Sequence, residues 1–79
     1  MSYALAWHAA SERDLRDLSH WRIAERIATA MMRFAETGEG VVEHAGKPGL
    51  YRLRVSGAVA LFTVDTVARE IRVWRVLRA

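Results

Sequence analysis

The stretch from residue 50 to residue 65, LYRLRVSGAVALFTVD, constrains the fold more than any other part of the chain. Side chains in a β-strand alternate between the two faces of a sheet, so Arg52 and Arg54 share one face and aliphatic residues occupy the other. Gly57 then permits a tight turn, because glycine adopts positive φ without steric cost. The almost continuously apolar run over 58–64 predicts a second strand that is buried on both faces, or nearly so.

Two further segments complete a predicted sheet. Residues 70–77, EIRVWRVL, follow a turn expected at Asp65-Thr66 and extend the first two strands into an antiparallel meander. This meander carries arginines on one side and aliphatic residues on the other. Near the N-terminus, Tyr3–Trp7 alternates weakly and has an aromatic residue at each end, so we interpret it as another strand of the same sheet.

Two helices are expected after this N-terminal strand. Residues 9–18 have a sparse apolar stripe among charged residues, whereas 21–36 gives the strongest helical signal in the chain. Ser19 is a candidate N-cap of the longer helix, and Gly38 lies where a left-handed C-cap is common. The predicted fold class is α+β: an N-terminal strand and an antiparallel two-helix hairpin, packed through its longer helix on a small antiparallel sheet. The apolar stripe of that longer helix consists of Ile23, Ile27, Met31 and Phe34.

Length and composition limit the class of protein. Seventy-nine residues with 52% hydrophobic content are enough for one small core, so we expect a single domain over 1–79. The absence of cysteine excludes disulfides and thiolate metal sites. The sequence also lacks a signal peptide's basic segment and apolar run, and any stretch of membrane-spanning length. A cytoplasmic protein without membrane contact is the expectation.

The net charge of +3 is unevenly distributed along the sequence. Residues 1–46 hold five arginines against seven acids, whereas 47–79 holds one lysine and six arginines against two acids. Eleven of the twelve basic residues are arginine, whose planar guanidinium suits phosphate and carboxylate contacts. The charge alone is equally compatible with nucleic-acid binding and with arginines that merely solvate a small sheet.

Several other kinds of site can be set aside. The glycines within 38–49 lack the spacing of a phosphate-binding loop, and the serines show no nucleophile motif. No pair of histidines or carboxylates has metal-ligand spacing with a credible partner, so we expect neither a metal nor another cofactor.

The order and spacing of the motifs resemble the RelE/ParE superfamily of toxins from bacterial type II toxin–antitoxin modules. The family pattern is roughly g-l-y-R-l-R-v-G-x-y-R-v-x-y-x-v-D followed by i-x-V-l-x-V-x-x-R. The chain has LYRLRVSGAVALFTVD followed by IRVWRVLR. Its Tyr3–Trp7, followed by Ala10, Asp14-Leu15 and Leu18, looks like the family's opening strand and first helix. The resemblance covers nearly the whole chain and implies the RelE-like fold.

The resemblance implies the toxin component of such a module. RelE-type members are mRNA interferases: they cleave messenger RNA in the ribosomal A site without a metal, through attack of the RNA 2′-hydroxyl on the adjacent phosphate. Clustered cations can neutralise the charge that develops on this phosphate, and a poised acid or base assists proton transfer. Arg52 and Arg54 match the family's basic strand pair and are the first catalytic candidates. His44, in the loop before that strand, is a third. Further RNA-binding candidates are Lys47, Arg72, Arg75 and Arg78.

The chain also departs from the family pattern, so three readings stay open. Val59 stands where the family has an arginine, and the usual acid or base near the C-terminus is absent. The first reading is a RelE-like, ribosome-dependent endoribonuclease that inhibits translation. The second is a ParE-like inhibitor of DNA gyrase, and the third is a degenerate member that mainly binds its antitoxin. The RNA-cleaving reading comes first because paired strand arginines suit RNA phosphates. The remaining histidines, His8 and His20, are expected in the helical half, away from the sheet face.

A cognate antitoxin is the expected protein partner, giving a hetero-oligomer. A chain this small has difficulty burying all its apolar positions in one layer of helix on sheet, and an antitoxin segment would cover the remainder. The ribosome with its mRNA, or DNA gyrase under the second reading, completes the expected partners. Candidate antitoxin contacts are Trp7, Trp21, Met32 and Trp74.

Overall fold

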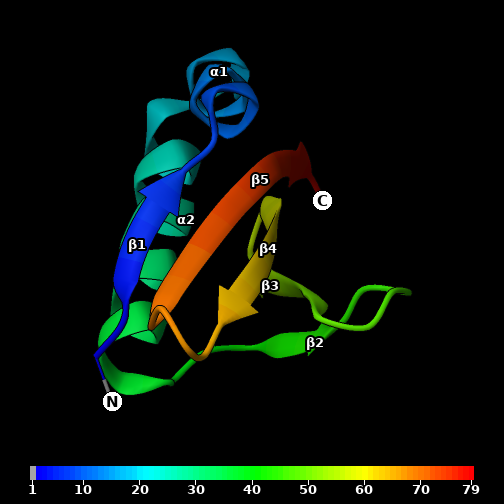
Figure 1. Cartoon of the computed structure of the whole chain (residues 1–79). Coiled ribbons are helices and arrows are strands. Elements are labelled where there is room, and N and C mark those ends of the chain that lie inside the picture. Colours follow the sequence, from blue (N-terminus) through cyan, green and yellow to red (C-terminus); the bar gives the residue numbers. More distant parts are fainter. Residues whose placement is uncertain (1) are drawn as a thin grey trace.

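The computed structural model describes residues 2–79, which form two helices and one five-stranded sheet (Figure 1). The strand order is β1-β5-β4-β3-β2. The predicted α+β class is therefore confirmed. The elements are β1 (Ala4–Trp7), α1 (Ala9–Asp17), α2 (Trp21–Thr37), β2 (Val42–His44), β3 (Leu50–Val55), β4 (Ala58–Asp65) and β5 (Glu70–Arg78).

The sheet is mixed rather than wholly antiparallel. Strands β2 to β5 pair antiparallel in sequence order, as the meander predicts. Strand β1 instead pairs parallel with β5, with Leu5 opposite Ile71 and Trp7 opposite Val73. Strands that are adjacent in sequence are connected by short turns that impose antiparallel pairing. The two helices separate β1 from the meander, so no local turn sets the direction of β1.

The ends of the helices are set by local hydrogen bonds. The imidazole Nδ1 of His8 accepts from the Ala10 backbone nitrogen at 3.2 Å, and His20 caps α2 in the same way. The N-cap of α2 is thus His20, and the prediction of Ser19 was wrong by one position. Gly38 has φ 80° and its N–H donates to the Phe34 carbonyl, so the predicted left-handed C-cap is confirmed.

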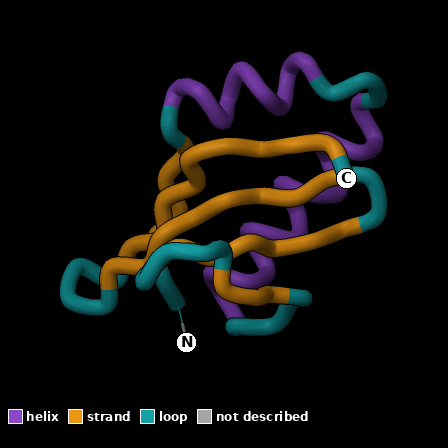
Figure 2. Tube along the Cα trace, turned by 90° about the vertical axis from the view of Figure 1, so that its right-hand side faces the viewer, coloured by secondary structure: helices purple, strands orange, loops and turns teal. Residues whose placement is uncertain are grey.

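The two helices diverge from the turn that joins them and cover different parts of the sheet (Figure 2). Helix α2 packs against β3, β4 and β1, whereas α1 lies along β5. The core forms between α2 and the sheet. There the ring centroid of Phe62 lies 5.3 Å from that of Phe34 and 5.7 Å from that of Tyr51. Its fully or nearly fully buried residues are Ile27, Met31, Ala35, Leu53, Ala58, Ala60, Phe62, Ile71, Val73 and Val76.

Strand β4 is buried on one face only, which corrects the sequence prediction. Ala60 and Phe62 point toward α2 and are fully buried, but Leu61 and Thr63 are only half-buried. Among residues 2–79, neither helix covers that second face.

The predicted turn at Gly57 is confirmed, with φ 94°. Neither described helix combines the length and apolar character needed to cross a membrane.

Candidate nucleic-acid interface

The face of the sheet opposite α2 carries most of the strand arginines, and we call it the open face. In the strand register, Arg52 of β3 and Arg75 of β5 flank Leu61 of β4. Adjacent strands are about 4.8 Å apart, so this row spans about 10 Å across three strands. The residues of the open face are Arg52, Arg54, Val59, Leu61, Thr63, Arg72, Trp74, Arg75 and Leu77.

An irregularity in β5 decides which side chains reach the open face. Leu61 pairs with Arg75 and Phe62 pairs with Val73, so Trp74 is left without a partner in the register. Such a bulge places two successive side chains on the same side of a strand. The Trp74 indole lies on the open face, where its Nε1 donates to the Thr63 hydroxyl at 2.9 Å.

The Trp74 ring is bordered by two further side chains. The guanidinium of Arg72 lies 5.7 Å from the ring centroid, within cation–π range. The imidazole of His8, which follows the end of β1, has its ring centroid 5.1 Å from that of Trp74. The prediction that His8 lies away from the sheet face was wrong, because β1 runs parallel to β5 and its end delivers the imidazole beside Trp74.

Every arginine of the open face is paired with a carboxylate of the described chain. Glu43 Oε1 lies 2.7 Å from Arg54 Nη2 and 3.9 Å from Arg52 Nη1. The other two pairs are Arg72 with Glu70 at 3.0 Å and Arg75 with Asp14 at 2.8 Å. Two of the three carboxylates, Glu43 and Asp14, come from the acidic half of the sequence. Folding therefore offsets much of the charge asymmetry seen along the chain.

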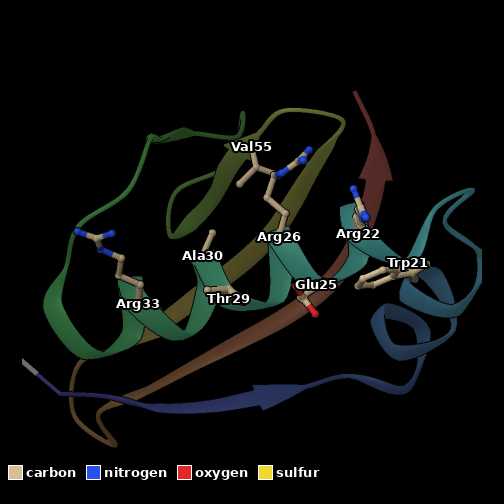
Figure 3. Close-up of a pocket in the computed structure, with 8 residues that line it drawn as sticks. All are labelled: Trp21, Arg22, Glu25, Arg26, Thr29, Ala30, Arg33 and Val55. Carbon is tan, nitrogen blue, oxygen red and sulfur yellow. The ribbon is translucent and has the colours of Figure 1, made fainter.

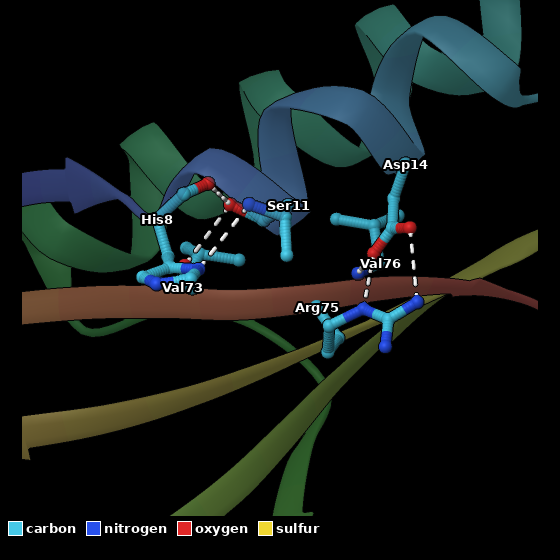
Figure 4. A network of polar contacts seen from close by, with 7 residues as sticks. His8, Ser11, Asp14, Val73, Arg75 and Val76 are labelled. Atoms are coloured by element: carbon cyan, nitrogen blue, oxygen red, sulfur yellow. Dashed lines mark hydrogen bonds and ion pairs between the residues drawn. The ribbon is translucent and has the colours of Figure 1, made fainter.

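The Asp14 pair is the most elaborate of these contacts (Figure 4). Its carboxylate accepts from Arg75 Nε at 2.8 Å and Nη2 at 3.2 Å, and from the Val76 backbone nitrogen at 2.8 Å. The hydrogen bond from Arg75, together with that from the Val76 N–H, lowers the pKa of Asp14 despite partial burial. The same carboxylate raises the pKa of Arg75. Both groups therefore remain charged at neutral pH.

The structure separates the remaining predicted RNA-contact residues from this face. His44 lies opposite Tyr51, with ring centroids 5.1 Å apart, on the side of β2 away from Glu43 and Arg52. Arg78 lies opposite the buried Ala58 and so projects from the side that α2 covers. Lys47 belongs to the loop between β2 and β3, which projects beyond the sheet (Figure 1).

The four predicted antitoxin contacts do not form one surface. Trp7 is half-buried against the core, and Trp74 belongs to the open face. Trp21 and Met32 are 64% and 53% exposed on α2. Trp21 lies beside its helical neighbour Arg22, whose guanidinium is 5.4 Å from the indole centroid.

A groove runs between α2 and the end of β3 (Figure 3). It has a volume of about 550 Å³, with Trp21 at one end and Ala30 and Val55 along it. A second hollow of about 420 Å³ shares Ala30, Arg33 and Val55 with the first, so the two adjoin. Three arginines follow one another along the helical wall: Arg22, Arg26 and Arg33.

Nothing in the described residues favours a metal-dependent site. No group of three or more histidine, aspartate or glutamate side chains within 2–79 is placed to hold an ion. The arginines of the open face carry hydrogen-bond donors and positive charge, which suit phosphate groups.

Comparison with known proteins identifies the architecture. No protein-family model matches the sequence, and no curated protein matches it. The structure does resemble a chain of the RelBE2 toxin–antitoxin complex from Mycobacterium tuberculosis, with a TM-score of 0.86 at 17% identity over 100% of this chain and 93% of that one. The chain has the RelE-like fold.

The RelE-like fold is shared with structures whose names refer to different toxins. The isolated E. coli RelE toxin matches with a TM-score of 0.74 and 17% identity, over 99% of this chain and 85% of that one. A chain of the P. aeruginosa ParDE system matches with a TM-score of 0.76 and 18% identity, over 98% and 96% of the two chains. The structural matches to RelE and ParDE chains confirm the RelE-like fold that the resemblance in sequence implied.

Proposed function

We propose that this chain is the toxin of a type II toxin–antitoxin module and acts as a RelE-like, ribosome-dependent mRNA endoribonuclease. The observation that carries the proposal is the row in which Arg52 and Arg75 flank Leu61 on the open face. Guanidinium groups on the two strands that flank β4 in a rigid sheet can hold one phosphate from two sides.

The proposed chemistry requires charge stabilisation more than any other contribution. When the 2′-hydroxyl attacks the adjacent phosphate, negative charge accumulates on the phosphoryl oxygens and then on the departing 5′-oxygen. Preorganised donors aimed at these oxygens lower the barrier because they need no reorganisation during the reaction. Arg52 and Arg75 are assigned this role, with Arg54 and Arg72 as flanking phosphate contacts. His44 is left outside the proposed centre because its ring lies on the other side of β2.

An antitoxin is the proposed protein partner, and the groove along α2 is its proposed seat. The RelBE2 structure and the intact E. coli RelBE structure are named as toxin–antitoxin complexes. The groove combines an apolar floor at Ala30 and Val55 with arginines along its wall. An amphipathic segment with acidic side chains would bury its apolar residues in the groove and pair its carboxylates with those arginines.

A ParE-like gyrase inhibitor is the second candidate function. Two observations favour it: the match to the ParDE chain, and the internal carboxylates that already occupy the open-face arginines. A gyrase-binding protein needs no catalytic group, so it tolerates valine at position 59. A member that only binds its antitoxin would tolerate the same features.

A reconstituted translation reaction distinguishes these functions. Purified chain is incubated with ribosomes and a defined messenger, and cleavage is mapped by primer extension. We expect ribosome-dependent cleavage that is lost in Arg52→Ala and retained in Arg78→Ala, which removes an arginine from the other side of the sheet. A gyrase supercoiling assay is run beside it. Intact messenger together with inhibited gyrase would replace the first function by the second, and inactivity in both assays would leave antitoxin binding alone.

A further inference from the structure

Glu43 is placed so that one carboxylate serves the two arginines of β3. Its Oε1 lies 2.7 Å from Arg54 Nη2, a close charge-assisted hydrogen bond, but 3.9 Å from Arg52 Nη1, which is beyond hydrogen-bond distance. The Nε of Arg52 is buried and has no hydrogen-bond partner among residues 2–79. One carboxylate thus satisfies Arg54 and leaves Arg52 with unused donors.

Two of the carboxylates that pair with open-face arginines, Asp14 and Glu43, differ in how firmly the fold holds them. Asp14 accepts three hydrogen bonds, including one from the β5 backbone, and its side chain is only 16% exposed. Glu43 is 54% exposed, and its ion pairs among the described residues are with the two arginines of β3. It belongs to β2, an edge strand of three residues. Exposed ion pairs of this kind contribute little to stability, so moving the Glu43 side chain aside costs the fold little.

We propose that Glu43 is an internal competitor for the anion that binds the β3 arginines, so that an RNA phosphate binds Arg52 and Arg54 by displacing the Glu43 carboxylate. This inference rests on the proposed phosphate-binding role of the open face. A phosphate group has several acceptor oxygens, so it can bridge both guanidinium groups. Glu43, by contrast, hydrogen-bonds only to Arg54 of the two. Arg52 makes the first contact, because its side chain is 38% exposed and its Nη1 lies beyond hydrogen-bond distance of Glu43; Arg54 joins once Glu43 has left.

This arrangement makes Glu43 a positioning residue with a measurable signature. In the native chain, an arriving phosphate must displace Glu43 from Arg54. The free energy gained from the Arg54–phosphate contact is therefore partly offset by the loss of the Arg54–Glu43 ion pair. In Glu43→Gln the guanidinium of Arg54 is free, and RNA affinity should rise about two- to fivefold, the range expected for an exposed ion pair. Because one more phosphate contact then releases counterions, the slope of log K against log salt should steepen by about 0.7 for single-stranded RNA.

The test measures binding of a single-stranded RNA oligonucleotide whose 2′-hydroxyls are replaced by 2′-methoxy groups, which prevents cleavage. Fluorescence anisotropy is recorded over a range of salt concentrations for the native chain and for Glu43→Gln. The matched control is Glu39→Gln, which removes the same charge from another exposed glutamate–arginine pair, Arg33–Glu39 at 3.5 Å, beside α2. Thermal unfolding verifies that each variant folds.

A double-mutant cycle adds a readout that a purely structural role would not change. Arg54→Ala should weaken binding slightly in the native background and more strongly in the Glu43→Gln background, because only there is Arg54 fully available. Arg52→Ala should weaken binding in both backgrounds. These results, with Glu39→Gln unchanged or nearly so, would support the inference.

Two outcomes would overturn the inference about Glu43, and only one of them also overturns the phosphate-binding role of the open face. If Glu43→Gln binds no more tightly than Glu39→Gln while Arg52→Ala still weakens binding, Glu43 is not a competitor and the phosphate-binding role of the open face survives. If Arg52→Ala leaves RNA binding unchanged, the open face is not the phosphate site. The proposed function then fails together with the inference.

Discussion

The carboxylate of Asp14 contacts the guanidinium of Arg75 through both of its oxygens, at 2.8 and 3.2 Å, and so ties the first helix to the last strand. β1 pairs with β5 as far as Val73. Beyond that point, side chains of α1 take over the edge: the Ser11 hydroxyl lies 3.0 Å from the Val73 carbonyl, and Asp14 accepts from the Val76 N–H (Figure 4). The part of β5 beyond the end of β1 would otherwise be an open edge, and this cover protects it from pairing with other chains.

Asp14→Ala should destabilise the fold by about 1–3 kcal/mol, because it leaves the partly buried Val76 N–H without its acceptor and Arg75 without its partner. Arg75→Ala is the matched control, since it removes the exposed ion pair but keeps the backbone contact, and it should cost clearly less because exposed ion pairs contribute little to stability. Urea denaturation measures both free energies of unfolding. Equal costs for the two variants would show that the backbone contact is unimportant.

Acidification should weaken the contacts that Asp14 makes with Arg75 and Val76, and so destabilise the fold. Arg75 and the Val76 N–H lower the pKa of Asp14 in the folded chain below its ordinary value of about 3.9. A lowered folded-state pKa contributes stability that is fully present above about pH 4 and is lost as the pH falls through the folded-state pKa. Between pH 5 and pH 2 the native chain should therefore lose more stability than Asp14→Asn does. Parallel losses in the two proteins would contradict this assignment.

Gly57→Ala should be more destabilising than Gly49→Ala. Both glycines have positive φ, 94° and 81°, so alanine is strained at either position by roughly 1 kcal/mol. At Gly57 the added Cβ would also lie 3.2 Å from Ile23 Cδ1, whereas at Gly49 it would meet no atom within 4 Å. The difference in free energy of unfolding between the two variants thus isolates the contact between the β3–β4 turn and α2. No difference would mean that Ile23 moves aside without cost.

The loss of RNA affinity on replacing a strand arginine should depend on which face of the sheet the arginine occupies, not on its position in the sequence. Arg52→Ala and Arg75→Ala should each weaken binding of single-stranded RNA and reduce the salt slope by about 0.7, because each removes one proposed phosphate contact. Arg78→Ala removes the same charge from the side that α2 covers and should change binding less. Titration of labelled RNA at several salt concentrations measures these effects. Equal losses for all three variants would indicate a response to net charge, not to a defined face.

Much of the fold was predictable because its signals are local. The period of two in residues 50–55, the glycine at position 57 and the helical spacing over 21–36 each specify an element without reference to distant residues. His20 in place of Ser19 as the N-cap is an exception of one residue, since an imidazole nitrogen can accept the same backbone hydrogen bond as a hydroxyl.

The membership of the open face was less predictable, because one irregular residue controls it. Strict alternation along β5 would put Arg72 and Arg78 on one face and Arg75 on the other. The bulge at Trp74 shifts the alternation, so that Arg75 joins Arg72 and Arg78 turns to the side covered by α2. The sequence around Trp74 contains no glycine or proline that would announce such a bulge.

The α+β class, the positions of the turns and the strand that carries Arg52 and Arg54 follow from local sequence patterns, since each depends on spacing within a few residues. Three other features could be seen only in the folded chain: the parallel direction of β1, the separation of His44 from Arg52, and the pairing of Glu43 and Asp14 with arginines far along the chain. These features depend on strand register and on contacts between distant segments. Such contacts form only when burial of the common core holds the elements together.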